Sequence, residues 1–129
     1  MYDMQTKERD RLSRSRQSLT RLAQEIVALV PVFMQREPMV KGTVYEQRRK
    51  CGKSNCACAT GKPHSTMILS RSQEGRTRLV SISEGQLVEL QVLTERYQRF
   101  RRARARLGQI YQKMIALIDE LEAARRREP

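Results

Sequence analysis

Tryptophan is absent from this sequence of 129 residues, and aromatic residues of any kind are few. Two Phe and four Tyr make up 5% of the chain, and hydrophobic residues as a whole reach only 39%. A chain of this length forms one domain, or one small domain that carries helical extensions. Its supply of large apolar side chains is small for a compact core. We therefore expect a metal ion or a partner chain to contribute to stability. So few aromatics also argue against a stacking surface for single-stranded nucleic acid.

Long apolar runs are missing as well. Residues 1–21 are polar and charged, so they do not resemble a secretory signal. The chain has no run of about 18 apolar residues that could cross a membrane. These features predict a cytoplasmic protein, and in that compartment clustered cysteines usually bind metal ions instead of forming disulfides.

Acidic residues are scarce relative to basic ones. The chain has 14 Asp and Glu against 26 Lys and Arg, which gives a formal net charge of +12. Arginine outnumbers lysine, and its planar guanidinium suits paired contacts with phosphate oxygens. A polyanion, and most naturally a nucleic acid, is the partner that this charge predicts. The alternative is a basic protein with a well-solvated surface.

Every cysteine and the only histidine of the chain lie between residues 51 and 64. Three thiolates and one imidazole are a ligand set of tetrahedral structural zinc sites. Such a site is closed to water, so we expect Zn²⁺ as a structural cofactor rather than a catalytic one. Ordinary buried thiols, or a redox pair of Cys51 and Cys58, are the alternatives; an iron–sulfur cluster usually takes four cysteines. The predicted metal ligands are Cys51, Cys56, Cys58 and His64.

The residue pattern predicts an α+β fold, with an N-terminal helix, a three-stranded antiparallel sheet and a long C-terminal helix. The first helix is expected at about residues 6–30, because Pro31 should end or kink it. A hairpin turn is expected at residues 73–75, with Gly75 at a positive φ angle. The predicted strands are residues 43–50, 66–71 and 76–82, with the zinc knuckle inserted between the first two.

The long helix is expected to begin after Ser83, a plausible N-cap whose capping box would include Gln86. This gives one structural unit with three parts: a helical arm at residues 1–37, the zinc-containing meander at 38–83 and the long helix at 84–129. A helix of about forty residues would span about 60 Å, which is longer than the sheet. Its far part therefore needs another surface, supplied either by the first helix in an antiparallel pair or by a second copy of the chain.

Heptad patterns support helical pairing. A seam is predicted on the first helix at Leu12, Ser15, Leu19, Leu22, Ile26, Leu29 and Phe33. On the long helix, one row is Leu90, Tyr97, Arg104, Tyr111 and Ile118, and the other is Leu93, Phe100, Leu107, Met114 and Leu121. This coiled-coil pattern predicts a homodimer through the C-terminal helix. Gly108 is expected to be a weak point where that helix bends or breaks, since Gly costs about 1 kcal/mol relative to Ala.

The spacing around the cysteines resembles a known family. The string Cys51-Gly52-Lys53-x-x-Cys56-x-Cys58-x-x-Gly61-x-x-His64, with Gly42-Thr43-Val44 before it and Gly75-Arg76-Thr77 after it, is similar to small bacterial and archaeal proteins classed as a domain of unknown function. The resemblance covers residues 40 to about 110. It implies no biochemical activity, but members often occur in phages, plasmids and transposons. The family usually continues His-Gly-Pro-Tyr, whereas this chain reads His64-Ser65-Thr66-Met67.

Two basic regions are candidate contacts for nucleic acid, one on the sheet and knuckle and one on the long helix. Phosphate contacts from either would make binding depend steeply on salt. With few aromatics for stacking, duplex DNA is favoured over RNA. The predicted residues are Arg48, Arg49, Lys50, Lys53, Lys62, Arg71, Arg76, Arg78, Arg96, Arg99, Arg101, Arg102 and Arg106.

Catalysis has little support, because no base is placed to activate a nucleophile and no phosphate-binding loop is present. The leading hypothesis is a non-enzymatic, zinc-stabilised DNA-binding accessory or regulatory protein of a mobile element. The alternative is an adaptor whose helices dock a recombinase, a transposase or another nucleoprotein complex. A third hypothesis is a redox or metal sensor that uses the three thiols.

Overall fold

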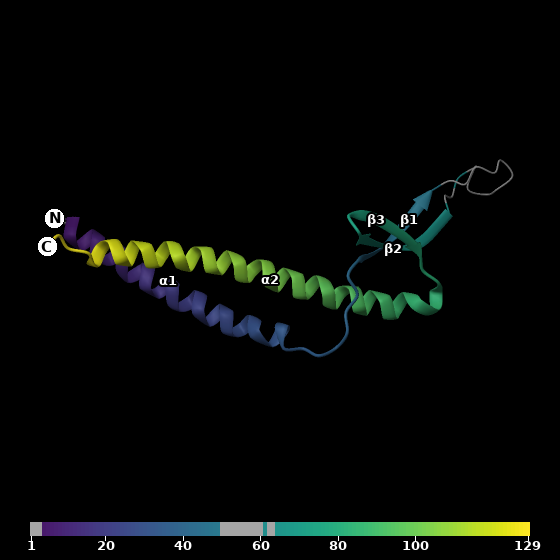
Figure 1. Ribbon diagram of the computed structural model, residues 1–129, viewed down its shortest axis with the longest axis horizontal. Helices are drawn as coiled ribbons and strands as arrows, with labels where there is room; N and C mark the ends of the chain where they lie inside the picture. Colours follow the sequence, from purple (N-terminus) through teal and green to yellow (C-terminus); the bar gives the residue numbers. More distant parts are fainter. Residues whose placement is uncertain (1–3, 50–60, 62–63) are drawn as a thin grey trace. The chain divides into compact units, whose positions relative to one another are not determined.

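The computed structural model describes residues 4–49, 61 and 64–129. It has α1 (Met4–Phe33), a sheet of β1 (Thr43–Arg49), β2 (His64–Gln73) and β3 (Arg76–Ser81), and then α2 (Glu84–Arg125) (Figure 1). The predicted α+β fold and order of elements are confirmed. The chain divides into two compact units, one of Met1–Gln35 with Phe100–Pro129 and one of Arg36–Arg99. The 42-residue helix α2 contributes to both.

The first unit is an antiparallel pair formed by α1 and the C-terminal part of α2 (Figure 1). Phe33 at the end of α1 packs edge-on against Phe100, with the ring centroids 5.4 Å apart. Toward the other end of the pair, Ser15 donates a hydrogen bond to Glu120. Residues near the start of α1 therefore contact residues near the end of α2, and residues near the end of α1 contact earlier residues of α2, as an antiparallel arrangement requires.

The seam of α1 is confirmed, since all seven predicted residues are half-buried or buried. Its one polar position, Ser15, is buried and satisfied by the carbonyl of Arg11 and the carboxylate of Glu120. The predicted end of the helix was wrong. Pro31 lies inside α1, which continues to Phe33. Pro31 lacks the N–H that would bond the carbonyl of Val27, but only two further residues of α1 follow it, and the last of them, Phe33, makes an aromatic contact with Phe100.

In the helix pair, only one of the two predicted rows on α2 forms the seam. Phe100, Leu107, Met114 and Leu121 are half-buried as expected, but Arg104, Tyr111 and Ile118 are exposed. Their places are taken by Ala103, Ile110 and Leu117, each one position earlier. Both sets have heptad spacing, and small or apolar side chains fit an interface better than the arginine at position 104. Of the bend or break expected at Gly108, a break does not occur, because α2 runs through this residue.

The second unit contains the sheet, in the order β1-β2-β3 with both pairs antiparallel. Strand β2 is longer than predicted at both ends, and β3 stops one residue earlier than predicted, while β1 is described up to Arg49 and Lys50 lies outside the described residues. The turn between β2 and β3 consists of Glu74 at φ 53° and Gly75 at φ 77°. Positive φ at both central residues suits the right-handed twist of a two-residue hairpin. This confirms the expectation for Gly75.

The sheet is tied to the N-terminal part of α2 by hydrogen bonds to the connection before β1. The amide of Val40 donates to the carbonyl of Leu93 at 3.1 Å. The Gln98 side chain donates to the carbonyl of Gly42 at 3.0 Å. Such a small sheet is marginal by itself, and here Ile68 and Leu69 of β2 are its buried apolar residues.

Ser83 precedes α2, as predicted for an N-cap. Its hydroxyl donates to the Gln86 side chain at 3.1 Å, so the two predicted box residues do meet. In the described part of the chain, neither helix has an apolar stretch long enough to traverse a bilayer.

Candidate anion-binding surface

Three arginines gather on one face of the β2–β3 hairpin. Arg71 on β2 lies directly opposite Arg78 on β3, and Arg76 follows the turn, paired with Gln73. Side chains two residues apart on a strand share a face, and so do directly paired residues. Arg71, Arg76 and Arg78 therefore project from the same side of the sheet. We call these three residues the arginine cluster.

The arginine cluster is not neutralised by the described part of the chain. All three residues are exposed, and none forms an ion pair or side-chain hydrogen bond within that part. Glu74 in the adjoining turn is close in sequence, but it is not ion-paired with any of them there. Like charges placed directly across a strand pair destabilise a sheet. A bound anion would relieve that repulsion.

A fourth positive charge lies beside Arg71. Lys41 and Arg71 both line a surface hollow of about 390 Å³, together with Val40, Ser72 and Gln73. Lys41 is exposed and lies just before Gly42, whose position is fixed by the hydrogen bond from Gln98. The hollow therefore joins the connection before β1 to the charged end of the β2–β3 hairpin.

The same face carries one carboxylate at its other end. Glu46 accepts hydrogen bonds from Ser65 and from Arg48, whose Nε lies 3.1 Å from the carboxylate. The Ser65 hydrogen bond first, and then Arg48, hold the pKa of Glu46 below its ordinary value. Arg48 is thus paired internally, whereas Arg71, Arg76 and Arg78 are not.

The zinc prediction concerns a segment that connects two paired strands. Arg49 of β1 pairs with His64 of β2, so residues 50–63 join adjacent strand ends. Six of the residues predicted to bind zinc or nucleic acid lie outside the described residues: Lys50, Cys51, Lys53, Cys56, Cys58 and Lys62. The structure describes His64 only by its place in β2. Among the residues that it does describe, no group of three or more His, Cys, Asp or Glu side chains could hold a metal ion.

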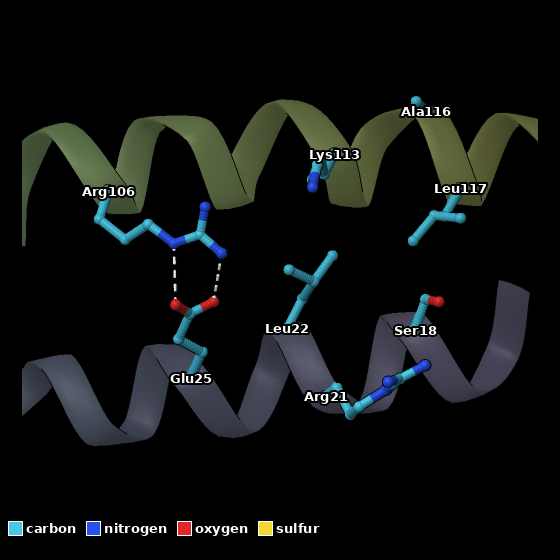
Figure 2. Close-up of a pocket in the computed structure, with 8 residues that line it drawn as sticks. All are labelled: Ser18, Arg21, Leu22, Glu25, Arg106, Lys113, Ala116 and Leu117. Atoms are coloured by element: carbon cyan, nitrogen blue, oxygen red, sulfur yellow. Dashed lines mark hydrogen bonds and ion pairs between the residues drawn. The ribbon is translucent and has the colours of Figure 1, made fainter.

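Two of the predicted arginines on α2 have partners inside the protein. Arg96 donates to the carbonyl of Pro38 at 3.1 Å. Arg106 binds Glu25 of α1 through two hydrogen bonds of 2.8 and 2.7 Å, at the edge of a groove of about 500 Å³ between the helices (Figure 2). The bond to Arg106 lowers the pKa of Glu25, and the same bond raises the pKa of Arg106.

Sequence reasoning missed the Glu25–Arg106 pair, although the sequence held a signal for it. Glu25 immediately precedes the seam residue Ile26, and Arg106 immediately precedes Leu107. Side chains that flank a seam on facing helices are placed to form interhelical ion pairs. Arg101, Arg102 and Arg104 of the helix pair stay exposed, as does Arg99 in the other unit.

The family described as a domain of unknown function (DUF6788) matches residues 7–92. This is well over half of the chain. The chain belongs to the DUF6788 family. Comparison with curated proteins and with solved structures gave no match.

The DUF6788 match separates the two predicted basic regions. It includes all three strands, and with them Lys41 and the arginine cluster, as well as the segment from Cys51 to His64. It ends within the first turns of α2, before Arg96 and the arginines that follow. The sheet surface is therefore part of the DUF6788 domain itself.

Proposed function

We propose that this DUF6788 protein is a non-enzymatic nucleic-acid-binding protein whose arginine cluster contacts the phosphates of duplex DNA. The observation that carries the proposal is the direct pairing of Arg71 with Arg78 on neighbouring strands. Two guanidiniums in that register repel each other unless an anion lies between them. Phosphate groups are the anions that a paired arginine fork fits best.

The wider charge of the molecule supports a polyanion over a single small anion. The net charge is +12, and Lys41 extends the cluster along the surface hollow. A row of positive charges along one surface gains affinity from each condensed counterion that it displaces from DNA. Binding of this kind is largely independent of sequence, because phosphate contacts position a protein without reading bases.

We further propose a supporting role for zinc. Cys51, Cys56, Cys58 and His64 would supply three thiolates and an imidazole in the connection between β1 and β2. Zinc there would hold the paired ends of these strands and so stabilise the sheet that carries the arginine cluster. The resemblance of the cysteine motif to proteins of phages, plasmids and transposons supports a role as an accessory or regulatory protein of a mobile element.

The test measures binding of the purified protein to a DNA duplex of random sequence. Fluorescence anisotropy of the labelled duplex gives the affinity at each of a series of KCl concentrations. A protein that replaces several phosphate counterions should lose affinity steeply, with a log–log slope of about −0.9 for each contact on B-DNA. A duplex RNA of the same length is the comparison for the preference for DNA. An affinity for DNA that is indifferent to salt would contradict the proposal.

A second candidate function is an adaptor that docks a larger nucleoprotein complex through its helices. The observation that favours it is the set of large apolar side chains left exposed on both helices of the pair, including Val27, Met34 and Tyr111. Contiguous apolar surface with polar edges is typical of protein-interaction sites.

A further inference from the structure

Apart from Met4 at the start of α1, six large apolar residues of the helix pair are exposed, and they follow a regular pattern. The exposed fraction reaches 71% for Val27 and Met34 and 65% for Tyr111. Each of the six comes immediately after a seam residue, as Val27 follows Ile26 and Tyr111 follows Ile110. We call this set the apolar flank; its members are Val27, Val30, Met34, Tyr111, Ile115 and Ile118.

The members on α1 and those on α2 lie on the same side of the helix pair. On both helices, the residues that line the groove in Figure 2 are seam residues or the residues immediately before them. Glu25 and Arg106 both precede seam residues, and they bind each other, so the preceding positions of the two helices share one side. Residues that follow seam positions project from the opposite side of each helix. The apolar flank is therefore one surface built from two helices.

The apolar residues run diagonally across this surface. Val27 and Val30 lie between the Glu25–Arg106 pair and the Phe33–Phe100 contact, and Met34 comes directly after Phe33 at the end of α1. Tyr111, Ile115 and Ile118 lie between the same ion pair and the Ser15–Glu120 hydrogen bond. Each helix thus supplies the apolar residues for a different half of the surface.

Exposed arginines lie on the two parts of this surface that the apolar residues do not cover, one part on each helix. Arg101 and Arg104 follow the seam residues Phe100 and Ala103, beside the apolar part of α1. Arg16 follows Ser15, beside the apolar part of α2. The only acidic residue that follows a seam position is Glu122, beyond the apolar residues of α2. An apolar diagonal with positive charge on both sides is complementary to an apolar stripe with negative charge on both sides.

We propose that the apolar flank binds an amphipathic, acidic helical segment of another protein. The apolar side chains of the segment would pack along the diagonal, and its Asp and Glu residues would pair with Arg16, Arg101 and Arg104. Binding of an amphipathic helix by an apolar groove is a common mode of recognition. The proposal specifies the partner for the adaptor function and rests on it, and it does not require the sheet to bind DNA.

A second copy of the chain fits this surface less well. Suppose that the apolar flanks of two copies face each other, related by a two-fold axis, with the helices of one copy parallel to those of the other. The diagonal line of apolar residues on one copy then crosses that on the other copy. The apolar quarters of one copy would then face the arginines of the other. Each copy also carries a net charge of +12, so that contact would bring like charges together at close range.

The experiment measures binding of a synthetic amphipathic peptide of about three heptads, with Leu at the apolar positions and Glu at the flanking positions. The reference peptide has the same Leu residues with Lys in place of Glu. Anisotropy of the labelled peptides should show binding of the Glu peptide that is about tenfold or more tighter than that of the Lys peptide. Equal affinity for the two peptides would overturn the proposal.

Two double variants test whether the Glu peptide binds at the apolar flank. Val27→Ser with Ile115→Ser should weaken binding of the Glu peptide by about tenfold or more. The control is Val88→Ser with Val92→Ser, which removes two exposed apolar residues of α2 from the other unit and should leave binding unchanged. Circular dichroism checks that each variant keeps its helix content. Equal loss in both variants, or in neither, would contradict binding at the apolar flank.

Two further readouts separate this proposal from its competitors. Light scattering that shows a wild-type dimer, lost in the Val27→Ser, Ile115→Ser variant, would assign the surface to a second copy and overturn the proposal. Binding to phosphatidylglycerol vesicles without peptide binding would assign it to a membrane surface and overturn the proposal too. Affinity for duplex DNA should not change in this variant, so a failure of peptide binding is distinct from a failure of the DNA-binding function.

Discussion

Gly42 lies close against the second strand, just before the chain enters the sheet. It is buried at φ +156°, and a Cβ atom there would lie 2.9 Å from both the Leu69 side chain and the Ser70 carbonyl. We expect Gly42→Ala to lower the free energy of unfolding by about 1–3 kcal/mol, because backbone strain adds to the contact. Urea denaturation measures the change.

The control for this substitution is Gly108→Ala, which lies inside α2 with open space around the added methyl group. Replacing Gly by Ala in a helix interior should raise stability by about 0.5–1 kcal/mol. If the two substitutions shifted stability in the same direction, the close packing at Gly42 would be contradicted.

The Glu25–Arg106 pair predicts a dependence of stability on pH. The hydrogen bond from Arg106 lowers the pKa of Glu25 from its ordinary value of 4.5. A carboxyl group with a lower pKa in the folded state stabilises the protein above its unfolded pKa, and this contribution is lost as the pH falls through the folded pKa. The loss should therefore begin near pH 4.5 and continue below it.

We expect Glu25→Gln to be less stable than wild type at neutral pH and to approach wild type in acid. Thermal unfolding between neutral and acidic pH, at low salt, measures the difference. Glu128→Gln is the control, since it removes the same charge from the C-terminal tail. Glu25→Gln and wild-type curves that ran parallel across the acid range would contradict a stabilising ion pair.

At the level of elements, the choice of seam on α2 is the main difference between sequence and structure. Tyr111 and Ile118 fit a heptad as well as Ile110 and Leu117 do, because α2 has apolar residues on two adjacent stripes. Periodicity alone cannot say which stripe meets α1. On α1 the stripe beside the seam is apolar only toward the C-terminal end, at Val27, Val30 and Met34, and mostly polar before it, so the longer seam was predicted residue by residue.

The seam of α2 can be tested with two isoleucines of the same helix. Ile110 is completely buried, so Ile110→Ala should cost about 2–5 kcal/mol through lost packing and the cavity that it leaves. Ile115 is 41% exposed and belongs to the apolar flank, so Ile115→Ala should change stability by about 0.5 kcal/mol or less. Chemical denaturation gives both values, and a larger cost at Ile115 would place the seam on the other stripe.

The sheet shows a second limit of sequence reasoning. Gly75 correctly predicted the turn between β2 and β3. The register of the hairpin was not fixed, because a turn at residues 73–75 leaves the pairing ambiguous, and a shift by one residue moves every side chain to the other face. The pairing of Arg71 with Arg78 therefore emerged only from the structure.

Zinc binding in the β1–β2 connection stays a prediction from the sequence. Protein purified without chelator should contain about one equivalent of zinc, as expected for one four-ligand site. Removing the metal, or the variants Cys56→Ser and His64→Ala, should lower the thermal midpoint, because metal binding is then part of the folding free energy. Plasma emission spectroscopy and calorimetry measure the two effects. Less than about half an equivalent of zinc would count against the four-ligand site.

For the whole molecule, the charge was evident from composition, but its distribution was not. The structure pairs Arg106 with Glu25 and Arg48 with Glu46, and it leaves the arginine cluster without an ion-pair partner in the described part of the chain. The partners of Arg106 and Arg48 depend on which elements come together in three dimensions. A list of basic residues alone could not separate arginines that stabilise the fold from those available to a ligand.

Two charge-matched variants test the central claim that the arginine cluster binds nucleic-acid phosphates. One is Arg71→Ala with Arg78→Ala, and the control is Arg126→Ala with Arg127→Ala, which removes two exposed arginines near the C-terminus. Both variants lose the same net charge, so only the position of the charge differs.

The deciding measurement is the slope of log affinity for duplex DNA against log salt concentration. Loss of two phosphate contacts should make the slope of the Arg71→Ala, Arg78→Ala variant shallower than that of wild type by about 2, since each contact contributes about 0.9. The control should keep the wild-type slope. If both variants kept that slope, or if the control lost as much of it as the cluster variant, the arginine cluster would not be the site of phosphate binding.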